Sequence, residues 1–524
     1  MSGVLDHPAS FNLAAHFVDR HIVEGRGEHP AIRHEGRIWT YREVSEAVNR
    51  AGHLLRTLGV QEEQRVMIVL PDSPEFVVAY FATVKIGAVA VPTNTALQSE
   101  EYALCLDDSR ARVLVVSAEL LPRLAPVLEG RRFLRHVVVV GPASSPYLDW
   151  DERLARESPV LDPAPTTGDD VAFWLWTSGS TGHPKAAVHL HMDWVHCCEC
   201  YARGVLDIGP HDVTFSPSKL FHAYGLGNAL MFPFYVGATT VLYSGRATAD
   251  VVLATVERER PSLFFSVPTL YAAMLQEAER RGSVDFSSVR AAVSAAEPLA
   301  ADIFIRWARR FGIEILDGLG STEVLHIYLS ARAGRVKAGS VGQPVPGCEI
   351  RIADANGNQA ADGEVGDLYV RGPSTALWYW NRRGATVERM QGEWFDTGDK
   401  AYRDGDGYFW YVGRSDDMLR VSGEWVSPIE LERALTAHDA VLEAAVVSYQ
   451  DERYVTKPMA FVVLKPGSAA PNDDLARELQ AFVRDRVTHY KCPRRITFVD
   501  RLPKTPAGKI QRFKLRGDVT TPPS

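Results

Sequence analysis

The stretch TSGSTGHPK, residues 177–185, follows directly on the apolar run VAFWLW at 171–176. Small residues after a buried strand let backbone N–H groups approach an anion closely, which favours phosphate binding. The spacing differs from that of a Walker A loop, which needs glycine, four residues and then Gly-Lys-Ser/Thr. Here Gly179 and Gly182 are three positions apart, and Lys185 precedes Ala186. The stretch therefore predicts a phosphate loop of a different kind from that of P-loop NTPases.

Short apolar runs alternate with longer amphipathic stretches on both sides of this loop. We expect buried strands at 65–70, 87–92, 112–117, 136–141, 171–176, 239–243, 262–267 and 290–296. Helices are expected at 43–58 and 97–108, among others. Such alternation predicts an α/β fold with parallel sheets covered by helices on both faces. Ligands of these folds bind beyond the carboxyl ends of strands, where the 177–185 stretch also lies.

After residue 350 the sequence changes to short strand-like runs separated by turn signals. Asp-Gly pairs between β-branched and aromatic runs predict hairpins over about 354–412. From about 417 onward we expect a small α+β domain, with strands near 443–448 and 459–464 and a helix near 473–487. The sequence thus indicates a large N-terminal domain of helix-covered sheets with a β-rich subdomain, and a small C-terminal domain.

Composition excludes several classes of protein. The 524 residues exceed what one core usually accommodates, and 46% hydrophobic with 23% charged residues is typical of globular proteins. A net charge of −8 argues against a nucleic-acid partner. We expect no secretory signal, because no N-terminal segment combines a basic start with an apolar stretch. No apolar run reaches the roughly 18 residues that span a bilayer. Six cysteines are too few for a disulfide scaffold, so we expect a cytoplasmic protein. Because no long apolar run is present, we also expect no membrane partner.

The stretch DGLGSTE at 317–323 ends in a carboxylate beside two hydroxyls. Glu323 is the kind of hard oxygen ligand that Mg²⁺ prefers when it bridges phosphate oxygens. The alternative is a turn in which Ser321 or Thr322 caps the next helix. Taken alone, the stretch favours that alternative, because short motifs often match by chance.

Three further stretches hold groups that suit a nucleotide. In WFDTGDK (394–400), Asp399 at a turn suits the two hydroxyls of a ribose, although Asp and Gly also favour an ordinary hairpin turn. Arg414 offers a rigid fork of donors to ribose or phosphate oxygens. Lys509 lies in the Pro/Gly-rich loop PKTPAGKIQR (503–512), where a lysine by itself usually indicates no more than solvated surface.

The stretch HLHMDWVHCCEC at 189–200 contains side chains that bind metals in other proteins. Structural zinc sites usually take cysteines in spaced pairs, and adjacent cysteines on a helix point in different directions. Buried cysteine is also a common small core residue. We therefore expect core packing here rather than a metal site.

Taken together, TSGSTGHPK, GSTE, WFDTGD, GRSDDML and PKTPAGK occur in an order and at spacings that resemble the adenylate-forming superfamily of acyl-CoA ligases, luciferases and peptide-synthetase adenylation domains. The resemblance covers about residues 11–515. The stretches SPSKLFHAYGLGNAL (216–230), GLGSTEVLHIYLS (318–330), VGQPVPG (341–347) and KIQRFKLR (509–516) most resemble the benzoate-CoA ligase branch.

This resemblance implies an ATP- and Mg²⁺-dependent aryl-acid:CoA ligase. Such an enzyme activates benzoate or a substituted benzoate, with 2-aminobenzoate one candidate, as an acyl-adenylate with release of pyrophosphate. It then forms the thioester with coenzyme A and releases AMP. A related alternative is a stand-alone adenylating enzyme that loads an acyl carrier protein.

The resemblance also implies the roles of individual residues. The phosphates of ATP would be held by Thr177, Ser178, Gly179, Thr181 and Lys185. Thr322 and Glu323 would place the α-phosphate and Mg²⁺, with Asp317 and Gly318 in the same nucleotide site and Asp399 and Arg414 on the ribose. The aromatic ring would be surrounded by His222, Ala223, Tyr224, Gly320, His326 and Ile327. Lys509 would be the catalytic lysine and Gly423 would line the CoA tunnel.

The implied domains are 1–415, which binds ATP and the acid, and 416–524, which carries Lys509 and rotates about a hinge at Asp416 between half-reactions. Departures from the family pattern are Ala186 in place of glycine and Arg420 in place of lysine. His222 stands where relatives in this branch have phenylalanine, which favours an amino- or hydroxybenzoate or a gate over the nucleotide.

Two other classes of function fit the sequence less well. A kinase or ATPase would release ADP, and the missing Walker A spacing disfavours it. An inactive relative acting as a binding module has no physical need for the full set of Lys185, Glu323, Asp399, Arg414 and Lys509.

Overall fold

The structure is a computed structural model, and it describes residues 10–178, 184–415, 417–421, 424–450, 456–468, 470–504, 510–512 and 514–515. The chain divides into two units, Met1–Ile350 with Val370–Phe395, and Arg351–Tyr369 with Asp396–Ser524. The predicted α/β class, with helix-covered sheets and a β-rich part, is confirmed.

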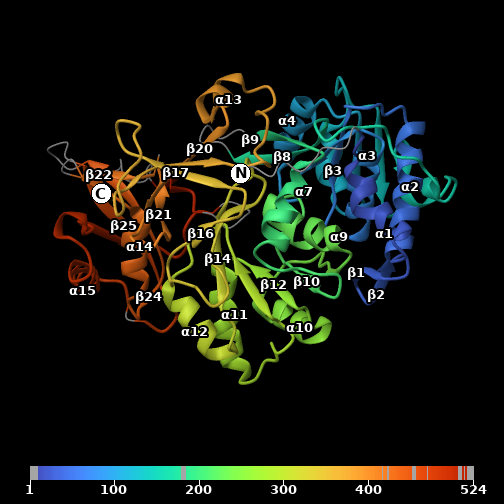
Figure 1. Cartoon of the computed structure of the whole chain (residues 1–524). Coiled ribbons are helices and arrows are strands. Elements are labelled where there is room, and N and C mark those ends of the chain that lie inside the picture. The colour runs from blue at the N-terminus through green and yellow to red at the C-terminus, as the bar shows by residue number, and fades with distance from the viewer. Residues whose placement is uncertain are drawn as a thin grey trace. The chain divides into compact units, whose positions relative to one another are not determined.

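The first unit contains two large sheets (Figure 1). Among the described residues one sheet has nine strands, in the order β16 (Gln343–Pro344), β15 (Ile327–Ser330), β14 (Ile315–Gly320), β13 (Ala291–Ser294), β12 (Leu263–Ser266), β10 (Val213–Phe215), β11 (Thr239–Val241), β1 (Pro30–His34) and β2 (Arg37–Thr40). Its central strands, from β14 to β1, pair in parallel, while β15, β16 and β2 are antiparallel additions at the edges.

The other sheet of this unit has seven described strands, in the order β7 (Leu148–Asp149), β6 (His136–Val140), β5 (Val113–Ser117), β3 (Arg65–Val69), β4 (Val89–Pro92), β8 (Val171–Ser178) and β9 (Pro184–Leu190). All of these pairs are parallel except β8–β9. The runs predicted from the sequence thus form strands, and their uninterrupted apolar character follows from burial on both faces.

Helices cover these sheets. Those of the first unit are α1 (Arg20–Val23), α2 (Tyr41–Thr57), α3 (Pro74–Lys85), α4 (Ser99–Ser109), α5 (Leu121–Leu124), α6 (Trp150–Leu154), α7 (Asp193–Cys197), α8 (Ala223–Leu226), α9 (Phe232–Val236), α10 (Ala249–Glu259), α11 (Pro268–Arg281), α12 (Ala301–Phe311) and α13 (Arg383–Arg389), with short 3₁₀ or π turns at Ala15–Asp19, Ala125–Val127, Cys198–Arg203 and Gly227–Met231. Helix α2 begins with a capping box, in which Thr40 and Glu43 bond each other's backbone N–H groups. Helices α10, α11 and α12 lie together beside β12 and β14 (Figure 1).

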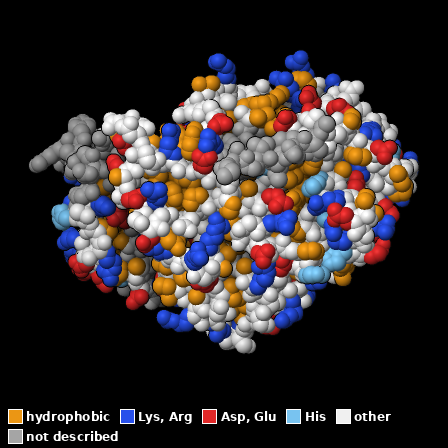
Figure 2. Space-filling model, viewed as in Figure 1, with side chains coloured by type: hydrophobic (Ala, Val, Ile, Leu, Met, Phe, Trp, Pro, Cys, Tyr) orange, Lys and Arg blue, Asp and Glu red, His pale blue; other side chains and the backbone are white. Residues whose placement is uncertain are grey.

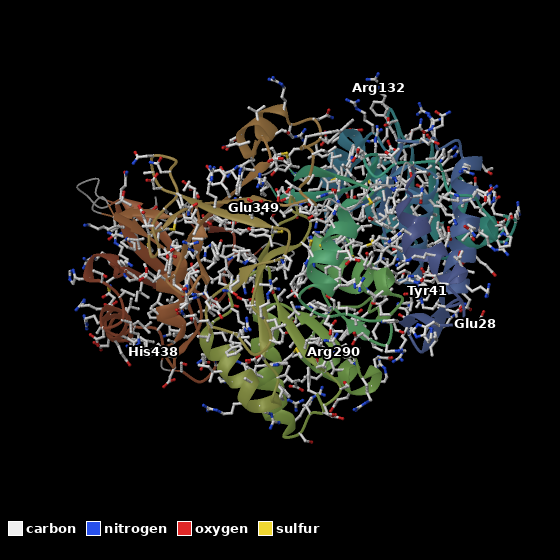
Figure 3. All side chains as sticks on the ribbon, in the orientation of Figure 1. Glu28, Tyr41, Arg132, Arg290, Glu349 and His438 are labelled. Atoms are coloured by element: carbon white, nitrogen blue, oxygen red, sulfur yellow. The ribbon has the colours of Figure 1, made fainter. Side chains whose placement is uncertain are left out.

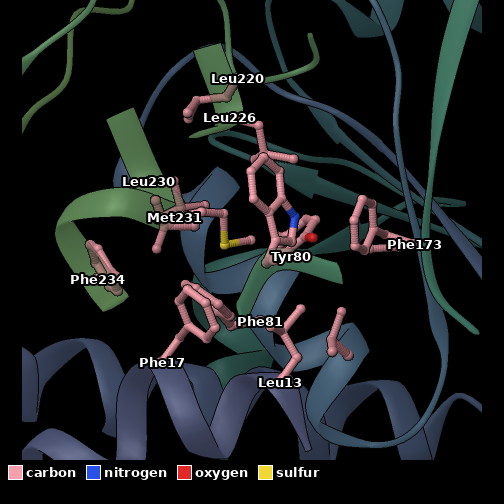
Figure 4. Packing of buried hydrophobic residues seen from close by; sticks show 14 of the residues in the cluster. Leu13, Phe17, Tyr80, Phe81, Phe173, Leu220, Leu226, Leu230, Met231 and Phe234 are labelled. Carbon is pink, nitrogen blue, oxygen red and sulfur yellow. The ribbon is translucent and has the colours of Figure 1, made fainter. Parts of the chain in front are cut away.

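The main core of the first unit consists of aromatic and aliphatic side chains from both ends of its sequence. Figure 4 shows Phe17, Phe81 and Phe234 packed together, with ring centroids 6.5 Å apart for the first pair and 5.6 Å for the second. This packing joins the N-terminal segment, which carries Phe17, to residues more than two hundred positions away, such as Phe234. The unit also contains polar contacts between distant residues: Arg290, labelled in Figure 3, donates from Nη2 to Asp212 Oδ2 at 2.8 Å.

The remaining strands are β17 (Glu349–Ala353), β18 (Gly366–Arg371), β19 (Met390–Gln391), β20 (Trp394–Arg403) and β21 (Phe409–Arg414) in one sheet, the hairpin of β22 (Leu419–Val421) and β23 (Glu424–Val426), and a sheet of β24 (Val441–Gln450), β25 (Thr456–Leu464) and β26 (Arg495–Phe498). The helices of the second unit include α14 (Pro428–Thr436) and α15 (Asp473–Arg484), with a 3₁₀ turn at His489–Lys491. The strands and helix predicted after residue 417 are confirmed. No described helix is both long and apolar enough to cross a membrane.

Candidate active site

The 177–185 stretch joins two antiparallel strands. Strand β8 continues through Thr177 and Ser178, and β9 begins at Pro184, so that Thr177 pairs with Lys185. The predicted loop after residue 176 is therefore too long by two residues at its start, because pairing with β9 carries the strand beyond its apolar part. Gly179 and Thr181 lie outside the described residues. Lys185 is half-buried, and its Nζ lies 4.8 Å from the centroid of the Tyr379 ring.

The second stretch of small residues also belongs partly to a strand. Asp317, Gly318 and Gly320 lie on β14 rather than in a loop, since this strand pairs with β15 through Gly320. A Cβ at Gly320 would lie 2.5 Å from the carbonyl oxygen of His326. Glycine at this position therefore allows the two strands to approach each other.

Thr322 and Glu323 lie in the turn between β14 and β15. The alternative of a helix cap is wrong as stated, because no helix follows, but Ser321 Oγ does accept a hydrogen bond from Val324 N at 3.2 Å. The Thr322 carbonyl accepts one from His189 Nε2 at 2.9 Å. Glu323 is 9% exposed, and its Oε1 accepts a hydrogen bond of 2.6 Å from the Tyr379 hydroxyl.

Residues 374–380, which we call the clamp segment, hold this turn against β9. Its Ala376 N donates to the Glu323 carbonyl at 2.7 Å, and Ser374 Oγ donates to the Val324 carbonyl at 3.0 Å. The same segment bonds β9 through Trp380 N to the Ala186 carbonyl at 2.9 Å. The turn that carries Glu323 and the strand that carries Lys185 therefore share one support.

The 189–200 stretch starts on β9 and continues into α7. His189 is fully buried and bridges Asp193 Oδ2, at 2.9 Å from its Nδ1, and the Thr322 carbonyl. His191 Nδ1 accepts a hydrogen bond from Leu13 N at 3.0 Å, and burial lowers the pKa of His191 to about 4. Burial raises the pKa of the Cys197 and Cys198 thiols. These side chains serve packing and support of the site.

The candidates for the acid pocket gather on α8, β14 and β15. His222 precedes α8, which begins with Ala223, and Tyr224 donates from its hydroxyl to the Ser266 carbonyl at 3.0 Å. The Tyr224 and His326 rings stack at 5.5 Å, and Ile327 pairs with Gly320. Burial lowers the pKa of His326 to about 3 and raises that of Tyr224, so both rings are neutral.

In the second unit Asp399 and Arg414 face each other on β20 and β21. Asp399 lies in the middle of a strand, so its predicted place at a turn is wrong; the turn of this hairpin lies at Asp404–Gly407. The carboxylate is 7% exposed, and its Oδ1 lies 3.2 Å from Arg414 Nη1. Arg414 also donates to the Thr397 carbonyl at 2.8 Å, which orients its guanidinium.

Asp416, Gly423 and Lys509 lie outside the described residues. Their described neighbours are tied together within the second unit. Arg512 donates to Glu432 Oε2 at 2.8 Å and lies 3.4 Å from Asp417 Oδ2. Burial raises the pKa of Glu432, while Arg512 opposes that rise.

Sequence reasoning missed three contributors to the site: Tyr379, Ser374 and the pairing of His189 with Asp193. Tyr379 lies in the run LWYW, a pattern typical of a hydrophobic core. Its partner Glu323 is 56 positions away in the sequence, so no local pattern connects the two residues. The sequence pattern marks His189 only as a type of side chain that binds metals in other proteins. The one local signal was a histidine and an aspartate four positions apart.

Two family models match the chain. One, described as AMP-binding enzyme, matches residues 19–380, and the other, AMP-binding enzyme C-terminal domain, matches residues 430–509. The chain is 47% identical over 513 residues to a benzoate–CoA ligase of Thauera aromatica, covering 97% of this chain and 96% of the relative. It is 42% identical over 506 residues to a 4-hydroxybenzoate–CoA/benzoate–CoA ligase of Rhodopseudomonas palustris, covering 97% and 94%.

Solved structures resemble the chain over a similar length. An anthranilate CoA ligase in complex with anthranoyl-AMP superposes with a TM-score of 0.93 at 39% identity, covering 98% of each chain. A benzoate CoA ligase from Burkholderia xenovorans LB400 superposes with a TM-score of 0.88 at 43% identity, covering 97% of this chain and all of the other (100%).

Proposed function

Because the chain belongs to the AMP-binding enzyme family, we propose that it is an ATP-dependent aryl-acid:CoA ligase that forms an aryl-adenylate and then an aryl-CoA thioester. The observation that carries this proposal is the shared support of Lys185 and Glu323 by the clamp segment. A cation and a carboxylate fixed on adjacent elements suit the phosphates of ATP and the metal ion that accompanies them.

Glu323 and Thr322 fit Mg²⁺ by their chemistry, because a carboxylate and a hydroxyl are both hard oxygen ligands. The Glu323 carboxylate is held by a hydrogen bond from the Tyr379 hydroxyl. When bound, Mg²⁺ neutralises charge on the phosphate oxygens. Lys185 attracts the phosphate groups that leave as pyrophosphate, and we assign Lys509 to the charge that develops on the α-phosphate. No side-chain nucleophile is needed, because the carboxylate of the acid attacks the α-phosphorus itself.

For the acid we propose benzoate or a substituted benzoate such as 2-aminobenzoate. Neutral aromatic and apolar side chains, with Tyr224 and His326 stacked, suit a planar ring. The benzoate ligases and the anthranilate ligase described above are similar over almost the whole chain. His222 at the start of α8 is the position from which a polar substituent would be recognised.

For the second half-reaction we propose that residues 416–524 rotate about Asp416 and that the CoA thiol approaches along Gly423. We place the reaction in the cytoplasm, because all six cysteines are unpaired and CoA is a cytoplasmic cosubstrate. A carrier protein is the alternative acceptor.

The proposal is tested with ATP, Mg²⁺, CoA and a panel of benzoate, 2-aminobenzoate, hydroxybenzoates, a cyclohexane acid and a medium-chain fatty acid. We expect aryl-CoA and AMP in equal amounts, with no ADP. Acid-dependent pyrophosphate exchange without a thioester would instead indicate a carrier protein as the acceptor. The absence of both, for every acid, would refute the proposal.

A further inference from the structure

Tyr379 contacts both charged groups of the proposed phosphate and metal site. Its hydroxyl donates to Glu323 Oε1 at 2.6 Å, a length typical of hydrogen bonds to an ionised acceptor. The face of its ring lies under Lys185, with Nζ 4.8 Å from the centroid, a geometry at which a cation is attracted to the ring. One side chain therefore contacts a carboxylate through its hydroxyl and an ammonium group through its ring.

Tyr379 is itself held firmly. It is 3% exposed, its backbone N donates to Thr386 Oγ1 at 3.0 Å, and it forms a β-bridge with Ala187 on β9. The next residue, Trp380, packs against Trp174 at 4.6 Å and donates from Nε1 to the Asp108 carbonyl at 2.9 Å. A phenol anchored in this way can fix the orientation of the groups that it contacts.

We propose that Tyr379 is a positioning residue that sets the orientation of the Glu323 carboxylate through its hydroxyl and the place of Lys185 through its ring. This inference rests on the proposed function of the same site. Residues that orient a metal-binding carboxylate commonly change metal affinity or activity by about 10–100-fold when they are replaced. The two contacts are separable, because phenylalanine keeps the ring and loses only the hydroxyl.

The test compares Tyr379→Phe, Tyr379→Leu and the control Leu104→Ala, a residue of helix α4 that lies outside the clamp segment and is 47% exposed. Binding of Mn²⁺ with α,β-methylene-ATP is measured by electron paramagnetic resonance, and binding of the same analogue without metal by calorimetry. Acid-dependent pyrophosphate exchange gives kcat and KM, and supplied aryl-adenylate with CoA gives the thioester rate. Thermal melting monitors folding.

For Tyr379→Phe we expect the Mn²⁺ affinity and the exchange kcat to fall about tenfold. The affinity for the metal-free analogue and the thioester rate should stay within about twofold of the wild type, and the melting temperature within about 2 °C. For Tyr379→Leu we expect, in addition, about threefold weaker metal-free binding, because Lys185 loses the ring. Leu104→Ala should match the wild type.

Wild-type Mn²⁺ affinity and kcat in Tyr379→Phe would overturn the proposal. So would equal losses in both half-reactions together with a lower melting temperature, which would indicate a purely structural role. If the wild type itself showed no exchange, the proposed function would fail, while the Mn²⁺ measurement would still decide the role of Tyr379.

Discussion

His191 shows at the scale of one residue how burial fixes a protonation state. Its Nδ1 accepts a hydrogen bond from Leu13 N at 3.0 Å, and this nitrogen must be unprotonated to do so. Burial lowers the pKa of His191 to about 4, below its usual value of 6.5. The ring is therefore neutral in the folded chain over the whole neutral range.

The stability of the chain should depend on pH through this residue. Between pH 6.5 and about 4 the unfolded chain binds a proton at His191 that the folded chain does not, so stability falls as the pH falls. The contribution is roughly 1.4 kcal/mol for each pH unit in that window. His191→Asn keeps an acceptor for Leu13 N and cannot be protonated. Melting temperatures of both proteins are measured at pH 7.5, 6.5 and 5.5. The wild type should melt at a higher temperature than His191→Asn, and this difference should become smaller below pH 6.5. A constant difference would contradict the prediction.

At the same scale, the sequence indicates the charged groups of the proposed site but not the side chains that contact them. Lys185 and Glu323 adjoin the small residues of their motifs, and the resemblance of the whole set of motifs to the family implies their roles. Tyr379 does not, because a buried aromatic residue in an aromatic run is indistinguishable from core until its partners are known.

At the scale of elements, strand pairing explains where the predicted loops were too long. Apolar runs mark only the buried part of a strand, whereas β8 and β14 continue through polar residues that pair with a neighbour. Asp399 lies within β20 for the same reason, opposite Arg414. Registers of this kind depend on the partner strand and are not encoded in local composition.

The β20–β21 register leads to a prediction about ATP. Asp399→Asn should raise the KM for ATP about 10–100-fold, because a hydrogen bond to a charged group contributes roughly 1.5–3 kcal/mol, while the KM for the acid stays unchanged. Asp362→Asn is the matched control, since Asp362 pairs with Arg403 at 2.7 Å but is exposed. Steady-state kinetics with each substrate varied give both constants. An ATP KM within twofold of the wild type would exclude a ribose contact.

Strand β9 leads to a second prediction. His189 donates to the Thr322 carbonyl from Nε2, and its Nδ1 lies 2.9 Å from Asp193 Oδ2. Glutamine places an amide where Nε2 lies, whereas asparagine reaches only the position of Nδ1. We therefore expect His189→Gln to keep most of the exchange kcat and His189→Asn to lose about tenfold, as an unsatisfied buried carbonyl costs roughly 1–3 kcal/mol. The reverse order would show that the bond to Thr322 does not matter for adenylate formation.

At the scale of the whole molecule, the fold class followed from the alternation of strands and helices, and the strand order did not. Strand β8 lies beside β4, and β1 beside β11, although about eighty and two hundred residues separate them. Such neighbours are set by the packing of distant apolar segments into one core, as Phe17 and Phe234 illustrate in Figure 4. On the face shown in Figure 2, acidic and basic side chains are interspersed and form no basic stripe, in line with the net charge of −8.

The change from adenylate formation to thioester formation is proposed to require a rotation about Asp416. The residues on either side of Asp416 are both anchored: Ser415 N donates to the Gly398 carbonyl at 2.8 Å, and Asp417 lies 3.4 Å from Arg512. We propose that a rotation between these anchors, which has few backbone torsions to use, would concentrate at residue 416. Proline fixes φ and would block it.

Asp416→Pro should therefore keep adenylate formation and impair thioester formation. Single-turnover experiments measure the first from ATP and acid, and the second from supplied adenylate and CoA. Asp473→Pro is the control, because Asp473 is the first residue of α15, a position that tolerates proline. We expect the control to leave both steps unchanged and Asp416→Pro to slow only the second. Equal loss of both steps in Asp416→Pro would place the hinge elsewhere, because a blocked rotation spares the half-reaction that precedes it.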